Sequence, residues 1–164
     1  MRFIGNKENI VDKIYQTMQE ANVKGNSFFD LFAGTCSVGK YFKKLNYQIY
    51  SSDLLFFSYV LQMAYIVNNS EPRFKKLLNN INAKSSTLFP SPLTLVVDYL
   101  NQIEPTEGFI FNNYTPGGTH TMKQPRMYYS DENGKIIDAI RLQIESWKGK
   151  NLITENEYYI LIAC

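Results

Sequence analysis

The segment from Phe28 to Phe42, FFDLFAGTCSVGKYF, constrains the fold of this chain more than any other stretch. Ser27–Phe32 has the apolar composition of a short buried strand, and Ala33–Cys36 form a turn of small residues. Ser37–Leu45 then carries apolar residues at helical spacing. A strand that turns into a helix in this way exposes backbone N–H groups beside the positive end of the helix. We therefore expect this corner to bind an anionic or carboxylate-bearing ligand.

The flanking segments extend the alternation of strands and helices. A helix is expected from Asn6 to about Ala21, a second strand from Tyr47 to Asp53, and a long apolar helix from Leu54 to Val67. Strands that alternate with helices predict a parallel sheet with right-handed crossovers. The first part of the chain therefore predicts an α/β fold with a doubly wound, mostly parallel sheet.

The rest of the chain is expected to be mainly helical. Helices are predicted at residues 73–83, 92–103 and 136–147, and a strand is predicted at Gly108–Tyr114. Thr154 and Glu157 have the spacing of a capping box, which predicts the start of a last helix. Thr115–Lys135 is predicted to be a long polar loop with a turn at Asn133–Gly134, and loops of this length usually have a function.

Composition excludes several classes of protein. Hydrophobic residues make up 45% and charged residues 20% of the 164 residues, which is typical of a globular chain. Cys36, Cys164 and the single His120 are too few for a disulfide framework or a zinc site, so no metal is expected and a reducing cytoplasm is the simplest location. No apolar run reaches the length of about 18 residues that a membrane helix needs, and no membrane partner is expected. The formal charge of +2 permits a nucleic-acid partner without requiring one.

The acids beside the turn narrow the choice of ligand. Asp53 follows Gly34 at about the spacing that places an acid at the end of the second strand, where it accepts hydrogen bonds from ribose hydroxyls. A dinucleotide site needs a glycine where this turn has Cys36, which disfavours a nucleotide-dependent oxidoreductase. Asp30 is better explained by a cationic group on the ligand, and S-adenosylmethionine has both an amino group and a sulfonium. The alternative is that Gly34 is only a turn glycine and Asp53 only a helix cap.

Three motifs resemble those of a known family. DLFAGTCSVGKYF is similar to the first motif of the S-adenosylmethionine-dependent DNA adenine-N6 methyltransferases, the bacterial modification methylases, which typically run D-L-F-x-G-T/S-G-x-V/A. RFIGNK (Arg2–Lys7) resembles the segment that packs over the methionine end of the cofactor in the subgroup where this segment comes first. YSSDL (Tyr50–Leu54) resembles the acid that ends the second strand. The resemblance implies a Rossmann-like methyltransferase fold.

The same resemblance implies which residues hold S-adenosylmethionine. Gly5 and Lys7 would lie near its carboxylate and amino end, Asp53 would hold the ribose, and Leu54 would lie against the adenine. The pocket floor would consist of Asp30, Phe32, Ala33, Gly34, Thr35 and Ser37. Two alternatives stay open from the sequence: Lys7 as a solvated lysine at the start of a helix, and Phe32 as a core residue.

The catalytic motif of the family, D/N/S-P-P-Y/F, does not occur among the 164 residues. Its polar side chain and a backbone carbonyl accept hydrogen bonds from the target amine, and its aromatic ring stacks on the flipped base. In this subgroup the motif follows the target-recognition region, so we expect the chain to be a fragment, truncated before the motif and catalytically incomplete alone. No residue is assigned a catalytic role. Residues 1–112 are predicted to be the cofactor-binding part, and residues 113–164 a polar loop and helices belonging to the DNA-recognition region.

Basic and aromatic side chains alternate in the polar loop, which suits contacts with phosphates and bases. Lys123, Arg126 and Tyr128 are predicted to contact double-stranded DNA; the alternative is an ordinary polar excursion. The leading hypothesis is the cofactor-binding portion of a methylase that transfers a methyl group from S-adenosylmethionine to adenine N6. The rivals are a non-catalytic cofactor-binding module and one half of a split methylase whose catalytic motif lies on a second polypeptide.

Overall fold

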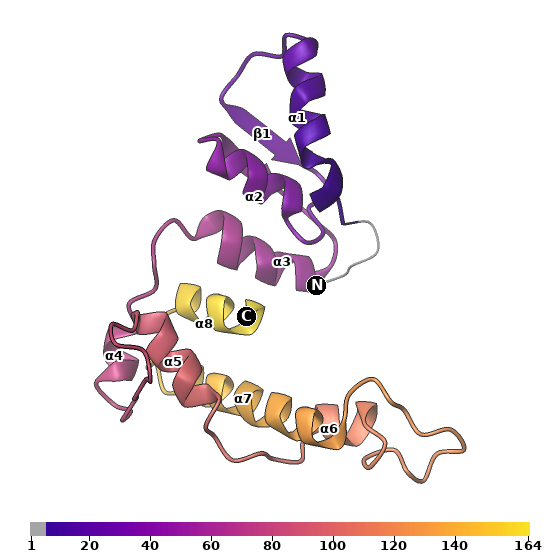
Figure 1. The fold of residues 1–164 in the computed structure, drawn as a ribbon, viewed down its shortest axis with the longest axis vertical. Helices are drawn as coiled ribbons and strands as arrows, with labels where there is room; N and C mark the ends of the chain where they lie inside the picture. Colours follow the sequence, from indigo (N-terminus) through magenta and orange to yellow (C-terminus); the bar gives the residue numbers. More distant parts are fainter. Residues whose placement is uncertain (1–5) are drawn as a thin grey trace. The chain divides into compact units, whose positions relative to one another are not determined.

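A computed structural model describes residues 6–164 of the chain (Figure 1). These residues divide into two compact units. Unit 1 comprises the residues up to Ser70 together with Tyr159–Cys164, and unit 2 comprises Glu71–Tyr158. Within residues 6–164, no helix combines the length and the apolar character needed to cross a membrane. The predicted division of function at residue 112 stays a prediction.

Unit 1 contains a small parallel sheet. Strands β1 (Ser27–Asp30) and β2 (Gln48–Ser51) pair in parallel, with Ser27 opposite Gln48 and Asp30 opposite Ser51. Helix α2 (Ser37–Lys44) lies between them in sequence and provides the crossover that parallel strands require. The first two predicted strands, their parallel direction and the α/β arrangement of this unit are therefore confirmed, and the sheet formed by the described residues has two strands.

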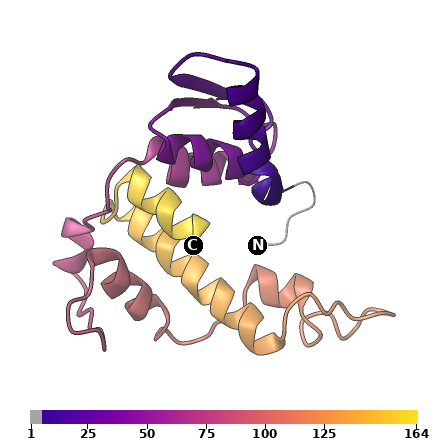
Figure 2. The same ribbon diagram turned by 45° about the horizontal axis from the view of Figure 1, so that its top comes forward.

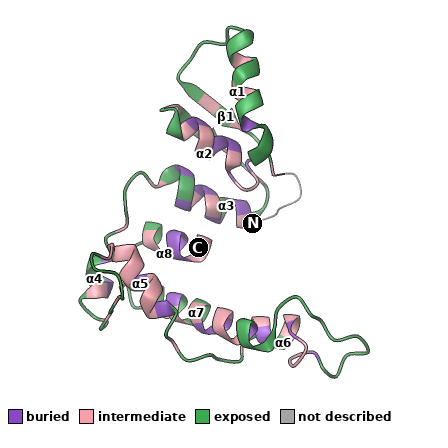
Figure 3. Cartoon of the chain, viewed as in Figure 1, coloured by how far each residue is buried: buried purple, intermediate pink, exposed green. Residues whose placement is uncertain are grey.

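The core of unit 1 lies on one face of this sheet. The turn η1 (Glu8–Ile10) leads into helix α1 (Val11–Glu20), and α1 and α2 bury Val11, Val38 and Phe42. The Phe28 ring stacks on the Phe42 ring with centroids 4.1 Å apart. Side chains of a strand alternate between its two faces, so Phe29 and Tyr50 point the other way and are 60% and 53% exposed. Figure 3 shows the buried faces of the helices against their exposed outer sides.

The apolar segment after β2 forms helix α3 (Phe56–Gln62), which continues into a π-helical turn, η2 (Met63–Val67). The N–H group of Asn68 donates to the Met63 carbonyl over 3.3 Å, five residues back, which defines the wider turn. The Lys43 ammonium donates to the carbonyls of Tyr65 (3.0 Å) and Ile66 (2.7 Å), and also to that of Asn68. These contacts satisfy carbonyls that the end of a helix leaves without partners.

Unit 2 is helical in the described residues. Its helices are α4 (Lys75–Leu78), α5 (Pro92–Leu100), α6 (Phe109–Tyr114), α7 (Asp131–Gly149) and the first residues of α8 (Glu155–Ala163). Its buried side chains include Phe74, Leu77, Val96, Ile144 and Trp147. The capping box is confirmed, because Glu157 Oε2 accepts from the Thr154 N–H over 2.8 Å and Thr154 Oγ1 accepts from the Glu157 N–H over 3.3 Å.

The predicted strand at Gly108–Tyr114 is wrong, because this segment forms α6, which lies beside α7 in Figure 2. Asp138 of α7 is 4% exposed and accepts from the N–H groups of Gly108 (3.0 Å), Ile110 (2.9 Å) and Phe111 (2.8 Å). The first N–H groups of a helix have no partners within the helix. Here the buried carboxylate of Asp138 is the hydrogen-bond partner of these N–H groups. This contact stabilises a short helix in a sequence whose aromatic residues favour a strand.

The predicted turn at Asn133–Gly134 is also wrong, because both residues lie in the first turns of α7. Ser130 caps this helix, since its Oγ accepts from the Asn133 N–H over 3.2 Å. A Cβ atom at Gly134 would lie 2.4 Å from Cγ2 of Thr115, so glycine permits the close approach of the two segments. The polar loop therefore ends at Ser130, five residues earlier than Lys135.

Candidate functional site

The turns that follow the two strands meet at the same edge of the sheet in unit 1. The Ala33 N–H donates to the Ser52 carbonyl over 3.0 Å, and the Gly34 N–H donates to Asp53 Oδ2 over 2.8 Å. Gly34 has φ +50°, a conformation that glycine adopts without strain, and no other atom lies within 4 Å of where its Cβ would be. We call Ala33–Ser37 and Asp53 the glycine corner, which leaves open space in front of a backbone turn.

Asp53 is a charged acceptor in this corner. Besides the Gly34 N–H, its carboxylate accepts from the Leu55 N–H over 2.9 Å. The N–H groups of Leu55 and then Gly34 hold the pKa of the Asp53 carboxyl below its ordinary value. The side chain is partly exposed, so its carboxylate oxygens are accessible to hydroxyl donors of a ligand.

Asp30 and Lys7, both predicted site residues, lie within electrostatic range of each other. Burial raises the pKa of the Asp30 carboxyl, while the Lys7 ammonium and the N–H groups of Phe32 and Gly39 act against this rise. Lys7 is exposed and precedes η1, where its carbonyl accepts from the Ile10 N–H over 3.0 Å. The end of β1 thus has a half-buried acid with a solvated cation near it.

Asn6 connects the N-terminal segment to the glycine corner. Its Oδ1 accepts from the Ser37 hydroxyl over 2.6 Å and from the Thr35 hydroxyl over 3.4 Å. The two hydroxyl oxygens lie 3.0 Å apart. Asn6 was not among the residues predicted from the sequence. The one feature that could have indicated it is its position in RFIGNK, between the predicted residues Gly5 and Lys7. Gly5 itself lies outside the described residues.

The other predicted cofactor-binding residues in and beside the glycine corner differ in exposure. Ala33 is buried, with 7% of its surface exposed, whereas Phe32 is 78% exposed and Leu54 is 98% exposed. The alternative that Phe32 is a core residue therefore does not hold. Two exposed apolar side chains close in sequence to Asp30 and Asp53 are available to a flat apolar ligand group.

Cys36 occupies the position where the family pattern has glycine. It has φ +60°, in the left-handed region, which is costly for a residue with a Cβ. Its side chain is fully buried beside Ala33 and Ile66, and burial raises the pKa of its thiol to about 11. The cysteine therefore strains the backbone of the turn, and its thiol belongs to the core of unit 1.

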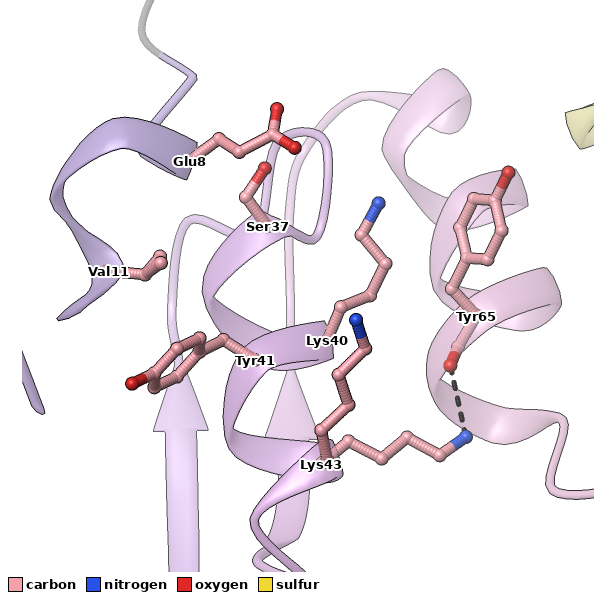
Figure 4. A pocket seen from close by; sticks show the side chains of 8 residues that line it. Glu8, Val11, Ser37, Lys40, Tyr41, Lys43 and Tyr65 are labelled. Atoms are coloured by element: carbon pink, nitrogen blue, oxygen red, sulfur yellow. Dashed lines mark hydrogen bonds between the residues drawn. The ribbon is translucent and has the colours of Figure 1, made fainter.

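A pocket of about 570 Å³ lies along α2 (Figure 4). Its lining consists of Glu8, Val11, Ser37, Lys40, Tyr41, Lys43, Lys44 and Tyr65. Lys43 extends from this lining to the carbonyls of η2, and the Lys40 ammonium lies 4.6 Å from the centre of the Tyr65 ring. Two of its three lysines thus make contacts within the chain, and Ser37 is the one predicted cofactor residue in the lining.

The predicted DNA-contacting residues lie in unit 2, and Arg126 and Tyr128 contact the end of α6. The Arg126 guanidinium donates to the Asn113 carbonyl over 2.9 Å and lies 5.8 Å from the centre of the Tyr114 ring. The ring centroids of Tyr114 and Tyr128 are 5.8 Å apart. Lys123, Arg126 and Tyr128 are all exposed. Arg126 and Tyr128 thus both lie beside the ring of Tyr114. Among residues 6–164, no group of three His, Cys, Asp or Glu side chains is arranged to hold a metal ion.

Comparison with known proteins gives consistent matches over nearly the whole chain. Residues 3–163 match the model of the D12 class N6 adenine-specific DNA methyltransferase family. Modification methylase StsI from Streptococcus sanguinis is 44% identical and type II methyltransferase M.FokI from Planomicrobium okeanokoites 42% identical, each over 99% of this chain. Type II methyltransferase M.NlaIII from Neisseria lactamica is 37% identical, also over 99% of this chain. The chain spans 23% of the length of the first two relatives and 43% of the third. No solved structure matches it.

Proposed function

Because the chain belongs to the D12 class N6 adenine-specific DNA methyltransferase family, we propose that unit 1 binds S-adenosylmethionine for the methylation of adenine N6 in DNA. The chain spans 23% of the length of StsI and of M.FokI, so the activity of a whole methylase is part of this proposal. The observation that carries it is the hydrogen bond from Gly34 to Asp53, which joins the first motif to the acid that ends the second strand.

The chemistry of the corner fits this cofactor. The partly exposed carboxylate of Asp53 suits the ribose hydroxyls, and the exposed side chains of Phe32 and Leu54 suit the adenine. Asp30 suits the cationic groups at the methionine end, and Lys7 suits the carboxylate. Ala33, Gly34, Thr35 and Ser37 would form the floor, with Gly5 included from the motif alone. S-adenosylmethionine supplies the activated methyl group, and the residues of this chain bind and orient it.

We also propose that the sheet of unit 1 is part of a doubly wound, Rossmann-like sheet. Parallel sheets in α/β proteins are normally covered on both faces, whereas Phe29 and Tyr50 are exposed on one face of this sheet. The catalytic D/N/S-P-P-Y/F motif does not occur in the 164 residues. Further polypeptide, in the same protein or in a second one, would complete the sheet and position the target amine. A cytoplasmic location belongs to the same proposal.

Double-stranded DNA is the proposed substrate, and Lys123, Arg126 and Tyr128 are the proposed contacts with it. The exposure of these side chains supports this role, because phosphates attract cations and bases stack on rings. The guanidinium of Arg126 is oriented by the Asn113 carbonyl, which restricts its motion before a ligand binds. The division into a cofactor-binding part at residues 1–112 and a DNA-recognition part at residues 113–164 is proposed on the same basis.

Calorimetric titration of the 164-residue chain tests the cofactor assignment. We expect S-adenosylmethionine and S-adenosylhomocysteine to bind at one site and NADH not to bind. Binding of NADH without binding of either methionine derivative would overturn the proposal in favour of an oxidoreductase.

A second experiment separates the methylase from the non-catalytic module, the rival that the missing motif favours. We expect methyl transfer to DNA when the chain is mixed with a polypeptide that carries the missing part of a D12 methylase, and none from the chain alone. Cofactor binding without transfer in that mixture would support the non-catalytic module.

A further inference from the structure

We infer that Asn6 is a positioning residue that makes the glycine corner select a cationic group of its ligand, because it fixes the hydroxyl protons of Thr35 and Ser37. The inference rests on the proposed function and extends it. It names the ammonium group of the amino-acid end of S-adenosylmethionine as the group that the two hydroxyl oxygens recognise.

The orientation of the Asn6 amide is determined by its other contacts. The backbone N–H of Glu8, which can only donate, lies 3.0 Å from Oδ1. The Glu8 carboxylate, which can only accept when ionised, has its Oε2 3.3 Å from Nδ2. Exchanging the oxygen and nitrogen of the amide would place donor against donor and acceptor against acceptor. The atom that faces the two hydroxyls is therefore the amide oxygen.

A count of protons then settles the role of each hydroxyl. Ser37 Oγ lies 2.6 Å from Asn6 Oδ1, an atom without a proton, so the single Ser37 proton points at Asn6. Thr35 Oγ1 lies 3.0 Å from Ser37 Oγ and 3.4 Å from Asn6 Oδ1. Since the Ser37 proton is already used, the Thr35 proton is directed at one of these two oxygens. Neither hydroxyl has a proton left for a ligand, and both present lone pairs.

Lone pairs without protons favour one kind of ligand group. An ammonium group carries three donors and no acceptor, whereas a carboxylate carries acceptors alone. The two hydroxyl oxygens would therefore favour an ammonium over a carboxylate. Asp30 adds a further acceptor at the end of β1, and the exposed Lys7 ammonium near it suits the carboxylate of the same ligand. Without Asn6, Ser37 would have a proton free to rotate toward either kind of group, or would give it to Thr35 and free the Thr35 proton instead.

The test compares two ligands in calorimetric titrations of the 164-residue chain: S-adenosylhomocysteine, and the analogue in which hydrogen replaces its amino group. We expect the unaltered chain to prefer the amino compound by about tenfold, the usual effect of a hydrogen bond to a charged group. Asn6→Ala should reduce this preference several-fold, whereas Asn6→Asp, which keeps an acceptor toward the hydroxyls, should retain it. Ser37→Ala is a second variant and should also reduce the preference.

A purely structural role would give a different pattern. If Asn6→Ala lowered the affinity for both ligands by the same factor, the preference for the amino compound would be unchanged and the inference would be overturned. Equal binding of the two ligands by the unaltered chain would overturn the inference and leave the proposed cofactor site intact. Binding of neither ligand by the unaltered chain would overturn both. Circular dichroism melting of each variant verifies that the fold is retained.

Discussion

Asp53 in unit 1 and Asp138 in unit 2 both accept hydrogen bonds from backbone N–H groups near the start of a helix. Asp138 accepts three, and it is 4% exposed. Asp53 accepts from the N–H groups of Gly34 and Leu55 and stays partly exposed. A carboxylate that is buried with its donors stabilises the fold, whereas one that stays partly exposed can also bind a ligand. Contact with backbone N–H groups therefore identifies a binding site only when the carboxylate is also accessible to a ligand.

The largest expected effect is on stability, at Asp138. Asp138→Ala leaves three N–H groups of α6 without their charged acceptor, and we expect the free energy of unfolding of unit 2 to fall by about 3 kcal/mol. Fluorescence of Trp147, the single tryptophan and a buried residue of unit 2, reports urea unfolding. The matched control is Asp131→Ala, which removes an exposed carboxylate that accepts from the Gly117 N–H. Equal losses in the two variants would contradict the distinction between buried and exposed carboxylates.

The next effect is on ligand affinity, at Asp53. Asp53→Ala should weaken the binding of S-adenosylhomocysteine by about tenfold or more, because a charged acceptor of the ribose hydroxyls is lost. The free energy of unfolding measured in urea by Trp147 fluorescence should not change, since Trp147 belongs to unit 2 and Asp53 to unit 1. Asp53→Asn, which retains one acceptor oxygen, should have an intermediate affinity in the same calorimetric titration. An unchanged affinity of the alanine variant would mean that the ribose is held elsewhere.

A smaller effect concerns pH and separates Asp53 from Asp30. The pKa of Asp53 is lowered in the folded chain, so its stabilising contribution is present at neutral pH and is lost as the pH falls below the ordinary value of 3.8. The pKa of Asp30 is raised, so its ionisation costs stability as the pH rises above 3.8. Asp30→Asn should therefore melt at a higher temperature than the unaltered chain at pH 7, with the difference vanishing near pH 3.

Circular dichroism melting at both pH values measures this difference. A variant that is less stable at pH 7 would show that the charged form of Asp30 is favoured by the fold. If the variant is more stable but binds S-adenosylhomocysteine less tightly, then Asp30 is retained for binding at a cost in stability.

The smallest effect is expected at Cys36. Cys36→Gly relieves a left-handed backbone conformation that costs roughly 1 kcal/mol, and removes a small buried side chain that contributes a similar amount. We expect little net change in melting temperature and an affinity for S-adenosylhomocysteine within about twofold of the original, because the side chain faces the core. Clearly tighter binding would show that the cysteine impairs the corner.

Local signals in the sequence were sufficient for most of unit 1. The helical spacing of Val38, Tyr41 and Phe42 and the glycine turn before them predicted the strand, turn and helix that the structure contains. The sequence of α6 failed as a guide because its stabilising partner, Asp138, stands 30 residues from Gly108. No local pattern in GFIFNNY records that a carboxylate will reach it, so its aromatic residues indicated a strand.

The candidate site shows the same limit. The spacing from Gly34 to Asp53 was readable because two parallel strands bring the turns after them to the same edge of the sheet. Asn6 was not readable, because its contact with Ser37 spans 31 residues and depends on where α1 and α2 pack. Chemistry that follows from backbone topology was thus predictable, whereas chemistry that depends on one side chain reaching another element was not.

The π-helical turn Met63–Val67 has a consequence for how sequences of this family diverge. Such a turn is an α-helix with one inserted residue, and deleting that residue would rotate one side of the helix by about 100° relative to the other. The Lys43 ammonium stabilises the wider turn through carbonyls that an unbroken helix would orient differently. Relatives that lack one residue in the segment equivalent to Met63–Val67 should therefore also have another residue in place of Lys43. Such a covariation joins segment length to residue type, and substitution tables do not register it.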